Sequence, residues 1–120
     1  MSEFDQSNFN NIIRKIIQKS LFTERQIEII LNQKDLINSK FTITKGAYYR
    51  QVSQSKEKLI GLFYSIILLR GLGIILPDDI DVISKLSEQI SVINNSDVFP
   101  EREDDVISVI DKVIRQTCNL

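Results

Sequence analysis

The feature that most constrains the fold is the spacing of the apolar residues, which recur three and four positions apart along most of the chain. This spacing matches the 3.6-residue period of an α-helix and not the alternation of a half-buried strand. Many of these residues are isoleucines, whose β-branched side chains disfavour a helix only weakly, so the pattern outweighs the propensity. Four glycines and two prolines are the only strong helix breakers in 120 residues. The sequence therefore predicts an all-α protein, and its length fits a single domain over residues 1–120.

Start and stop signals place the helices along the chain. Thr23 and Gln26 form a capping box, because the Thr hydroxyl can accept from the Gln amide while the Gln side chain bonds back. Thr44 is typical of the N-cap of a long helix, and prolines begin the last two helices. The expected elements are helices over Asn8–Lys19, from Thr23, over Gln33–Asn38, from Lys45 to about Arg70, from Pro77 to about Asn94 and from Pro100, with a loop over Asn94–Asp97.

Residues 59–76 are the most apolar stretch of the chain (LIGLFYSIILLRGLGIIL). A bilayer span needs about 20 apolar residues, whereas Arg70 interrupts this run and leaves only Leu59–Leu69 without a charge. A helix that is apolar on all sides is buried on all sides. We therefore expect residues 59–76 to form a central core helix, completed by a second copy of the chain. The C-terminal helices are expected to join this homodimer interface, and no membrane association is expected.

The composition lacks the residues of the commonest catalytic and metal sites. The chain has no histidine and a single cysteine, Cys118, so a Cys/His pair and His-based metal ligation are excluded. Gly71 and Gly73 are too close together for a phosphate-binding loop and fit the end of a helix. The acidic residues after Pro100 match no calcium loop and suit a helix N-terminus. We expect a protein that is not an enzyme and has no cofactor or metal site.

Charge is distributed unevenly along the chain. Residues 1–70 hold 11 Lys or Arg and 6 Asp or Glu, a net charge of +5, whereas residues 71–120 hold 4 and 10, a net charge of −6. A basic half favours an anionic partner, although two halves of opposite charge can also complement each other within a fold. A single thiol excludes an internal disulfide, and the polar segment Met1–Asn11 gives no secretory signal, so the cytoplasm is the expected location.

The stretch from Thr23 to Leu59 divides into an apolar and a polar side. At helical spacing, Tyr48, Val52, Ser55 and Leu59 form one stripe that can face the preceding helices. The opposite side carries cationic and hydrogen-bonding side chains, as a helix that enters the major groove of DNA requires. The residues on that side are Lys45, Tyr49, Arg50, Ser53, Gln54 and Lys56.

Two segments of this stretch resemble a known motif. FTERQIEII (residues 22–30) resembles the first helix of the helix-turn-helix in the fourth region of bacterial sigma factors and in LuxR-type regulators. ITKGAYYRQVSQSKEKL (residues 43–59) is similar to their turn and recognition helix. The resemblance covers residues 23–59. This sequence departs from the pattern at Tyr48, where Val is usual, at Gln54-Ser55, where Arg-Ala is usual, and in its poorly matched middle helix.

The resemblance implies a DNA-binding role for eight residues. Base-facing positions are Lys45, Ala47, Tyr49 and Arg50, and phosphate contacts come from Thr44, Ser53, Gln54 and Lys56. Further cations that could contact phosphate are Arg14, Lys15, Lys19, Arg25, Lys40 and Lys58. The sequence thus predicts a transcriptional regulator or architectural protein that binds double-stranded DNA. The alternative is a non-enzymatic helical interaction module, such as an adaptor or an antitoxin-like dimer, in which the polar side is only a solvated face.

Overall fold

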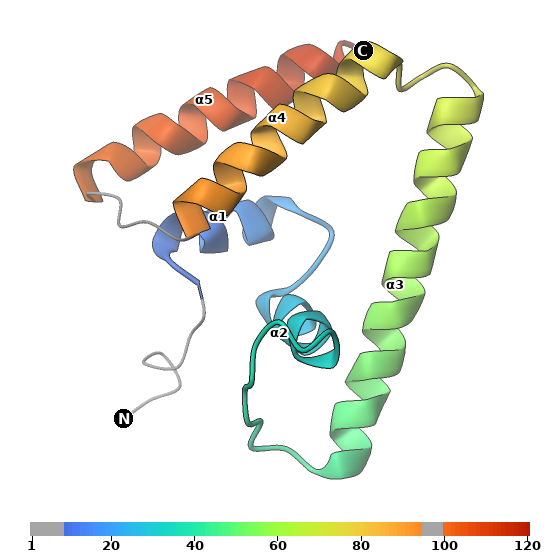
Figure 1. Ribbon diagram of the computed structural model, residues 1–120, viewed down its shortest axis with the longest axis vertical. Coiled ribbons are helices and arrows are strands. Elements are labelled where there is room, and N and C mark those ends of the chain that lie inside the picture. Colours follow the sequence, from blue (N-terminus) through green and yellow to red (C-terminus); the bar gives the residue numbers. More distant parts are fainter. Residues whose placement is uncertain (1–8, 95–99) are drawn as a thin grey trace. The chain divides into compact units, whose positions relative to one another are not determined.

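The computed structural model describes residues 9–94 and 100–120, which form five α-helices and no strand (Figure 1). The helices are α1 (Asn11–Lys19), α2 (Glu24–Gln33), α3 (Lys45–Gly71), α4 (Pro77–Asn94) and α5 (Pro100–Cys118). The all-α prediction is confirmed. The chain divides into two compact units, one with α1, α4 and α5 and the other with α2 and α3, over Ser20–Ile74. The single domain over residues 1–120 stays a prediction.

The first unit packs α1 against both α4 and α5, which also contact each other. Its buried residues are Ile12, Ile13 and Ile17, which belong to the apolar stripe expected from the sequence. Helix α1 begins later than predicted because Asn10 caps it: the Ile13 N–H donates to Asn10 Oδ1 at 2.9 Å. The predicted start at Asn8 and residues 95–97 of the predicted loop lie outside the described residues.

Ion pairs link α1 to α5 in this unit. Lys15 Nζ lies 3.0 Å from Asp104 Oδ1, and Lys19 Nζ lies 3.8 Å from Asp111 Oδ1. Arg115 donates to Asp111 from the next turn of α5 at 2.7 Å, and this hydrogen bond lowers the pKa of the Asp111 carboxyl. Two of the cations that the sequence offered for phosphate contact are therefore paired with carboxylates within the protein.

The second unit packs α2 against the first half of α3, and the rest of α3 continues beyond α2 (Figure 1). The predicted capping box is present, because Thr23 Oγ1 accepts from the Gln26 N–H and Gln26 Oε1 accepts from the Thr23 N–H. The most buried residue of the unit is Ile29 on α2, with 0% of its surface exposed. From α3, Ser55 is buried and Tyr48, Val52 and Leu59 are half-buried, so the predicted inner stripe is confirmed.

The predicted short helix over Gln33–Asn38 is wrong, because α2 ends at Gln33 and residues 34–44 are not helical. A Schellman motif ends α2: the Leu36 N–H donates to the Leu31 carbonyl and the Asp35 N–H to the Asn32 carbonyl. Asp35 has a φ of 57°, in the left-handed region, which directs the chain out of the helix. An eleven-residue connector, residues 34–44, therefore joins α2 to α3.

Asp35→Gly is expected to stabilise this unit by about 1 kcal/mol, because glycine adopts a left-handed φ without the steric cost of a Cβ. The matched opposite change is Gly73→Ala, since Gly73 occupies the same position in the motif that ends α3, at a φ of 76°. It is expected to destabilise by about 1 kcal/mol. Urea unfolding followed by tyrosine fluorescence measures both, because Tyr48, Tyr49 and Tyr64 all lie in this unit. A destabilised Asp35→Gly protein would contradict the argument.

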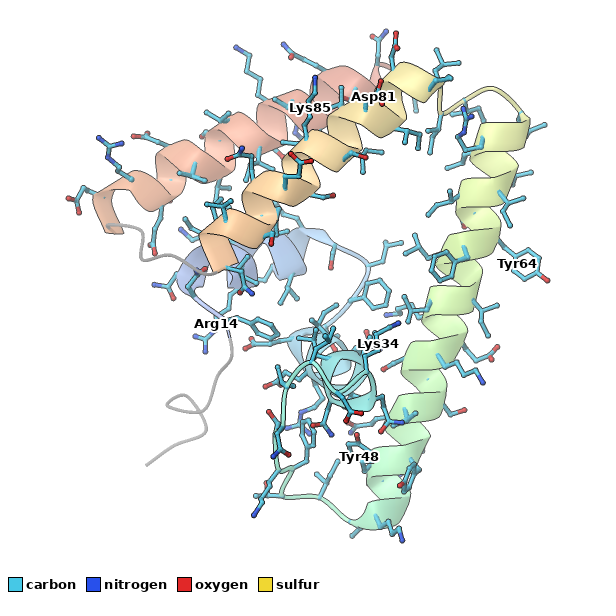
Figure 2. The ribbon with its side chains drawn as sticks, viewed as in Figure 1. Arg14, Lys34, Tyr48, Tyr64, Asp81 and Lys85 are labelled. Atoms are coloured by element: carbon cyan, nitrogen blue, oxygen red, sulfur yellow. The ribbon has the colours of Figure 1, made fainter. Side chains whose placement is uncertain are left out.

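In a single copy of the chain, the apolar residues 59–76 do not form a buried core helix, because many of their side chains are exposed. Six large apolar side chains on the second half of α3 are 37–71% exposed: Ile60, Phe63, Tyr64, Ile66, Ile67 and Leu68. Figure 2 shows Tyr64 projecting from the side of α3 that faces away from α2. None of the described helices is long and apolar enough to cross a bilayer.

Candidate nucleic-acid interface

The outer side of the first three turns of α3 carries the polar side chains that the sequence singled out. Lys45, Tyr49, Arg50, Ser53, Gln54 and Lys56 are all exposed. Residues 49, 53 and 56 come one position after residues 48, 52 and 55, so they lie about 100° around the helix from the stripe that packs on α2. Arg50 and Gln54 come two positions after residues 48 and 52, so they lie roughly opposite that stripe. The structure therefore brings six of the eight predicted residues together on one open surface.

The other two predicted residues belong to the start of α3. Thr44 is its N-cap, and Thr44 Oγ1 accepts from the Ala47 N–H at 3.1 Å. Ala47 is half-buried, so it is less available for contact than its neighbours. The space beside Gly46 is open, since a Cβ built there would meet nothing within 4 Å. The backbone at this helix end is accessible, and a helix N-terminus favours anions such as phosphate.

Hydrogen bonds to Tyr48 fix the first turn of α3 against α2. The Tyr48 hydroxyl donates to Gln33 Oε1 and accepts from Asn32 Nδ2, each at 2.9 Å. Asn32 Oδ1 also accepts from the backbone N–H of Ser39 at 3.1 Å, which links the connector to α2. The Tyr48 side chain therefore links the first turn of α3 to the last turn of α2.

Aromatic contacts extend this framework to the outer surface. The Phe41 ring lies 5.4 Å from the Tyr48 ring, and the Arg25 guanidinium lies 5.3 Å from the centre of the Phe41 ring. Tyr49 meets the Tyr48 ring edge-on at 5.3 Å and is 54% exposed. Tyr49 is thus oriented by a partially buried neighbour while its outer part faces solvent, where it can contact a ligand.

Three cations of the outer side have no ion-pair partner in the part of the chain that the structure describes. Lys45, Arg50 and Lys56 form no ion pair with any residue in the described ranges 9–94 and 100–120. By contrast, Lys58 donates to Gln26 Oε1 at 3.0 Å and lies over the Phe22 ring, and Arg25 lies 3.9 Å from Glu28. The sequence offered all of these cations for DNA contact. In the structure Lys58 and Arg25 have partners within the protein, whereas Lys45, Arg50 and Lys56 form no ion pair with the described residues.

The two units differ in charge. Ser20–Ile74 contains 8 Lys or Arg and 4 Asp or Glu, a net charge of +4, and the rest of the chain contains 7 and 12, a net charge of −5. The predicted phosphate contacts Arg14, Lys15 and Lys19 belong to the acidic unit and not to the unit that contains α3. The basic surface is therefore carried by α3 and the connector, where Lys34 and Lys40 are also exposed.

Ser55 determines how closely α2 and α3 approach. Its side chain is 1% exposed, and its hydroxyl has no hydrogen-bond partner among the residues that the structure describes. A buried hydroxyl without a partner costs free energy, so Ser55→Ala is expected to stabilise the unit by about 1 kcal/mol. Ser55→Leu is expected to destabilise it by about 1–3 kcal/mol, because the added atoms overpack the contact. Urea unfolding followed by tyrosine fluorescence distinguishes the two, and equal effects would contradict this role.

Comparisons of the chain with protein-family models, curated proteins and solved structures found no match. Within the described residues, no three His, Cys, Asp or Glu side chains come together in a way that could hold a metal ion.

Proposed function

We propose that this protein binds double-stranded DNA through the outer side of the first three turns of α3. The observation that carries the proposal is a set of three exposed cations, Lys45, Arg50 and Lys56, which form no ion pair with any described residue. They surround the hydrogen-bonding side chains of Tyr49, Ser53 and Gln54. An α-helix fits the major groove of B-DNA, where such side chains reach base edges and phosphates. Arg50 is the residue best suited to bidentate recognition of a guanine.

The proposal extends the resemblance to helix-turn-helix proteins. In that arrangement α2 supports α3, which acts as the recognition helix, and the inner stripe of α3 packs on the apolar side of α2. The eleven-residue connector is longer than the usual turn of three or four residues. The hydrogen bonds from Tyr48 and Asn32 compensate for this length by holding both helices and the connector together.

A transcriptional regulator or an architectural protein fits this surface, and we propose that it acts in the cytoplasm as a homodimer. The sequence implicates residues 59–76 and the C-terminal helices in the dimer contact. Exposure of Ile60, Phe63 and Ile67 supports the first of these regions, because large apolar side chains seldom gather on a surface that has no partner.

The same apolar surface favours a second candidate function, a non-enzymatic protein-interaction module. In that case the second half of α3 would bind a different protein, and the polar first half would be a solvated face. The two functions differ in their response to salt, because phosphate contacts release counterions and an apolar contact does not.

Fluorescence anisotropy with labelled random-sequence duplex DNA tests the proposal over a salt series. We expect micromolar binding at low salt and, for each bound copy, a slope of about −3 in a plot of log affinity against log salt concentration, because Lys45, Arg50 and Lys56 displace counterions from the DNA. An identical series with a protein of the same size and a net charge near −1 controls for nonspecific attraction. Absence of binding at low salt would overturn the DNA proposal and leave the interaction module.

A further inference from the structure

One line of side chains runs along the outer side of α3 and changes in character halfway. Positions 49, 53, 56, 60, 63 and 67 follow each other at intervals of four, three, four, three and four residues. This is the 3.5-residue period of a coiled-coil seam, in which such positions stay on one side of a helix. Tyr49, Ser53 and Lys56 make the first half of the line polar, and Ile60, Phe63 and Ile67 make the second half apolar.

The apolar half is large enough to be one side of a dimer. Taking roughly 200 Å² for a fully exposed large side chain, the exposed fractions of Ile60, Phe63, Tyr64, Ile67 and Leu68 leave roughly 600 Å² of apolar surface. This is at the upper end of the roughly 300–600 Å² of the largest patch on a typical monomer. It is about three quarters of the roughly 800 Å² that each partner buries in a standard interface.

The partner that best fits this uncharged, apolar surface is a second copy of the same chain. Leu59–Leu69 contains no charged residue, so a complementary surface must be apolar and similar in length. The same segment of a second copy satisfies both conditions, as a two-fold contact requires. Ile60 and Ile67 lie at equivalent seam positions, and in parallel coiled coils β-branched residues at such positions favour two strands over three or four.

The direction of pairing follows from the position of the polar half on the same line. In a parallel pair, both polar halves extend from the same end of the seam and face the space between the two helices. Continuous helices that diverge from a dimer seam in this way grip one DNA duplex through its major groove. In an antiparallel pair, the polar halves extend from opposite ends and face opposite directions, so they cannot contact one straight duplex together.

We infer that α3 pairs in parallel with α3 of a second copy through Ile60, Phe63 and Ile67, and that the two polar halves diverge to hold a single DNA duplex. The gripping of DNA rests on the proposed function, whereas the pairing rests on the apolar surface alone. Helix α3, of 27 residues, is about 40 Å long, of which the first half binds DNA and the second half binds its copy.

The pairing is tested first by the molar mass of the full chain in solution, measured by light scattering after size exclusion. The wild type is expected to be a dimer and Ile67→Lys a monomer, because two lysines would meet across the seam. Leu36→Lys is the matched control, since Leu36 is 66% exposed and Ile67 68%, and it is expected to remain a dimer. A monomeric wild type, or a dimeric Ile67→Lys protein with native circular dichroism, overturns the inference.

Disulfide formation tests the direction of pairing without DNA. In a Cys118→Ser background, Ile60→Cys and Ile67→Cys are made separately and oxidised. A parallel pair places each position opposite itself, so both variants are expected to cross-link to dimers. In an antiparallel pair at most one position meets its copy, because residues 60 and 67 are about 10 Å apart along the helix and a disulfide needs Cα atoms within about 7 Å. Cross-linking of only one variant, or of neither, overturns the parallel arrangement.

DNA binding by the same proteins distinguishes the pairing of α3 from the proposed binding of DNA by the pair. Ile67→Lys adds a positive charge, so a loss of affinity reflects the loss of pairing and not weaker electrostatic attraction. We expect a loss on the order of 10²-fold, because two linked sites gain that much from binding together. A wild-type dimer that cross-links as predicted but binds no DNA overturns the proposed function and supports the pairing. A Ile67→Lys monomer with wild-type affinity overturns the joint grip of one duplex.

Discussion

Replacing Lys45, Arg50 and Lys56 together with alanine is expected to weaken binding to duplex DNA about a hundredfold near 0.15 M salt. Each of these cations is exposed and forms no ion pair among the described residues, so each can neutralise one phosphate or contact a base. The loss of three cations that displace counterions should also make the slope of log affinity against log salt less negative by about 3 for each bound copy. Anisotropy titrations of the variant and the wild type over the same salt series measure both quantities.

A matched triple variant controls for the change in net charge. Lys85, Arg102 and Lys112 are exposed on α4 and α5, in the acidic unit, and their replacement with alanine removes the same charge (Figure 2 labels Lys85). This variant is expected to keep most of the affinity and the salt slope of the wild type. Equal losses in the two triple variants would show that net charge, and not the outer side of α3, determines binding. The single change Arg50→Ala is expected to cost about 1–3 kcal/mol on a specific site.

Ile29→Ala is expected to destabilise the α2–α3 unit by about 2–5 kcal/mol. Ile29 is fully buried where α2 packs on α3, and its truncation removes apolar contacts and leaves a cavity. Small domains have only about 5–15 kcal/mol of stability, so this change removes a large part of it. Urea unfolding followed by tyrosine fluorescence measures the effect, because all three tyrosines lie in Ser20–Ile74 and none in the other unit.

The control for this prediction is Leu21→Ala in the same unit. Leu21 is 73% exposed, and an exposed side chain away from caps and partners changes stability by less than about 0.5 kcal/mol. Similar shifts of the two unfolding midpoints would mean that Ile29 is not at the centre of the α2–α3 contact. Far-ultraviolet circular dichroism, which reports on all five helices, should still show α1, α4 and α5 when α2 and α3 of the Ile29→Ala protein have unfolded.

Local signals in the sequence were sufficient for most of the helices. The bounds of α4 were predicted from the proline that begins it and the apolar spacing that follows, and α3 was predicted to within one residue at its end. The capping box at Thr23 and the cap at Thr44 form as predicted, because a cap depends on residues only three positions apart. The inner stripe of α3 was also predictable, since helical period alone places Val52 and Ser55 on one side.

The sequence did not predict where α2 ends or which residues hold α2 and α3 together. Apolar Leu36 and Ile37 suggested a short helix, but the left-handed Asp35 ends α2 before them. Aspartate in this conformation is uncommon, and nothing in its neighbours predicts it. The hydrogen bonds of the Tyr48 hydroxyl to Asn32 and Gln33 were also missed, because they join residues 15 and 16 positions apart.

The sequence by itself determined the helical class, the position of α3 and which of its residues face outward, because each of these follows from the period of one helix and its caps. Only the tertiary structure decided which cations are free. Lys15 and Lys19 are paired with carboxylates more than 80 positions away, and Lys58 is held by Gln26, whereas Lys45, Arg50 and Lys56 remain unpaired among the described residues. The physical reason is that an ion pair depends on the distance between two side chains in space. The residue pattern of a single helix holds no information about that distance.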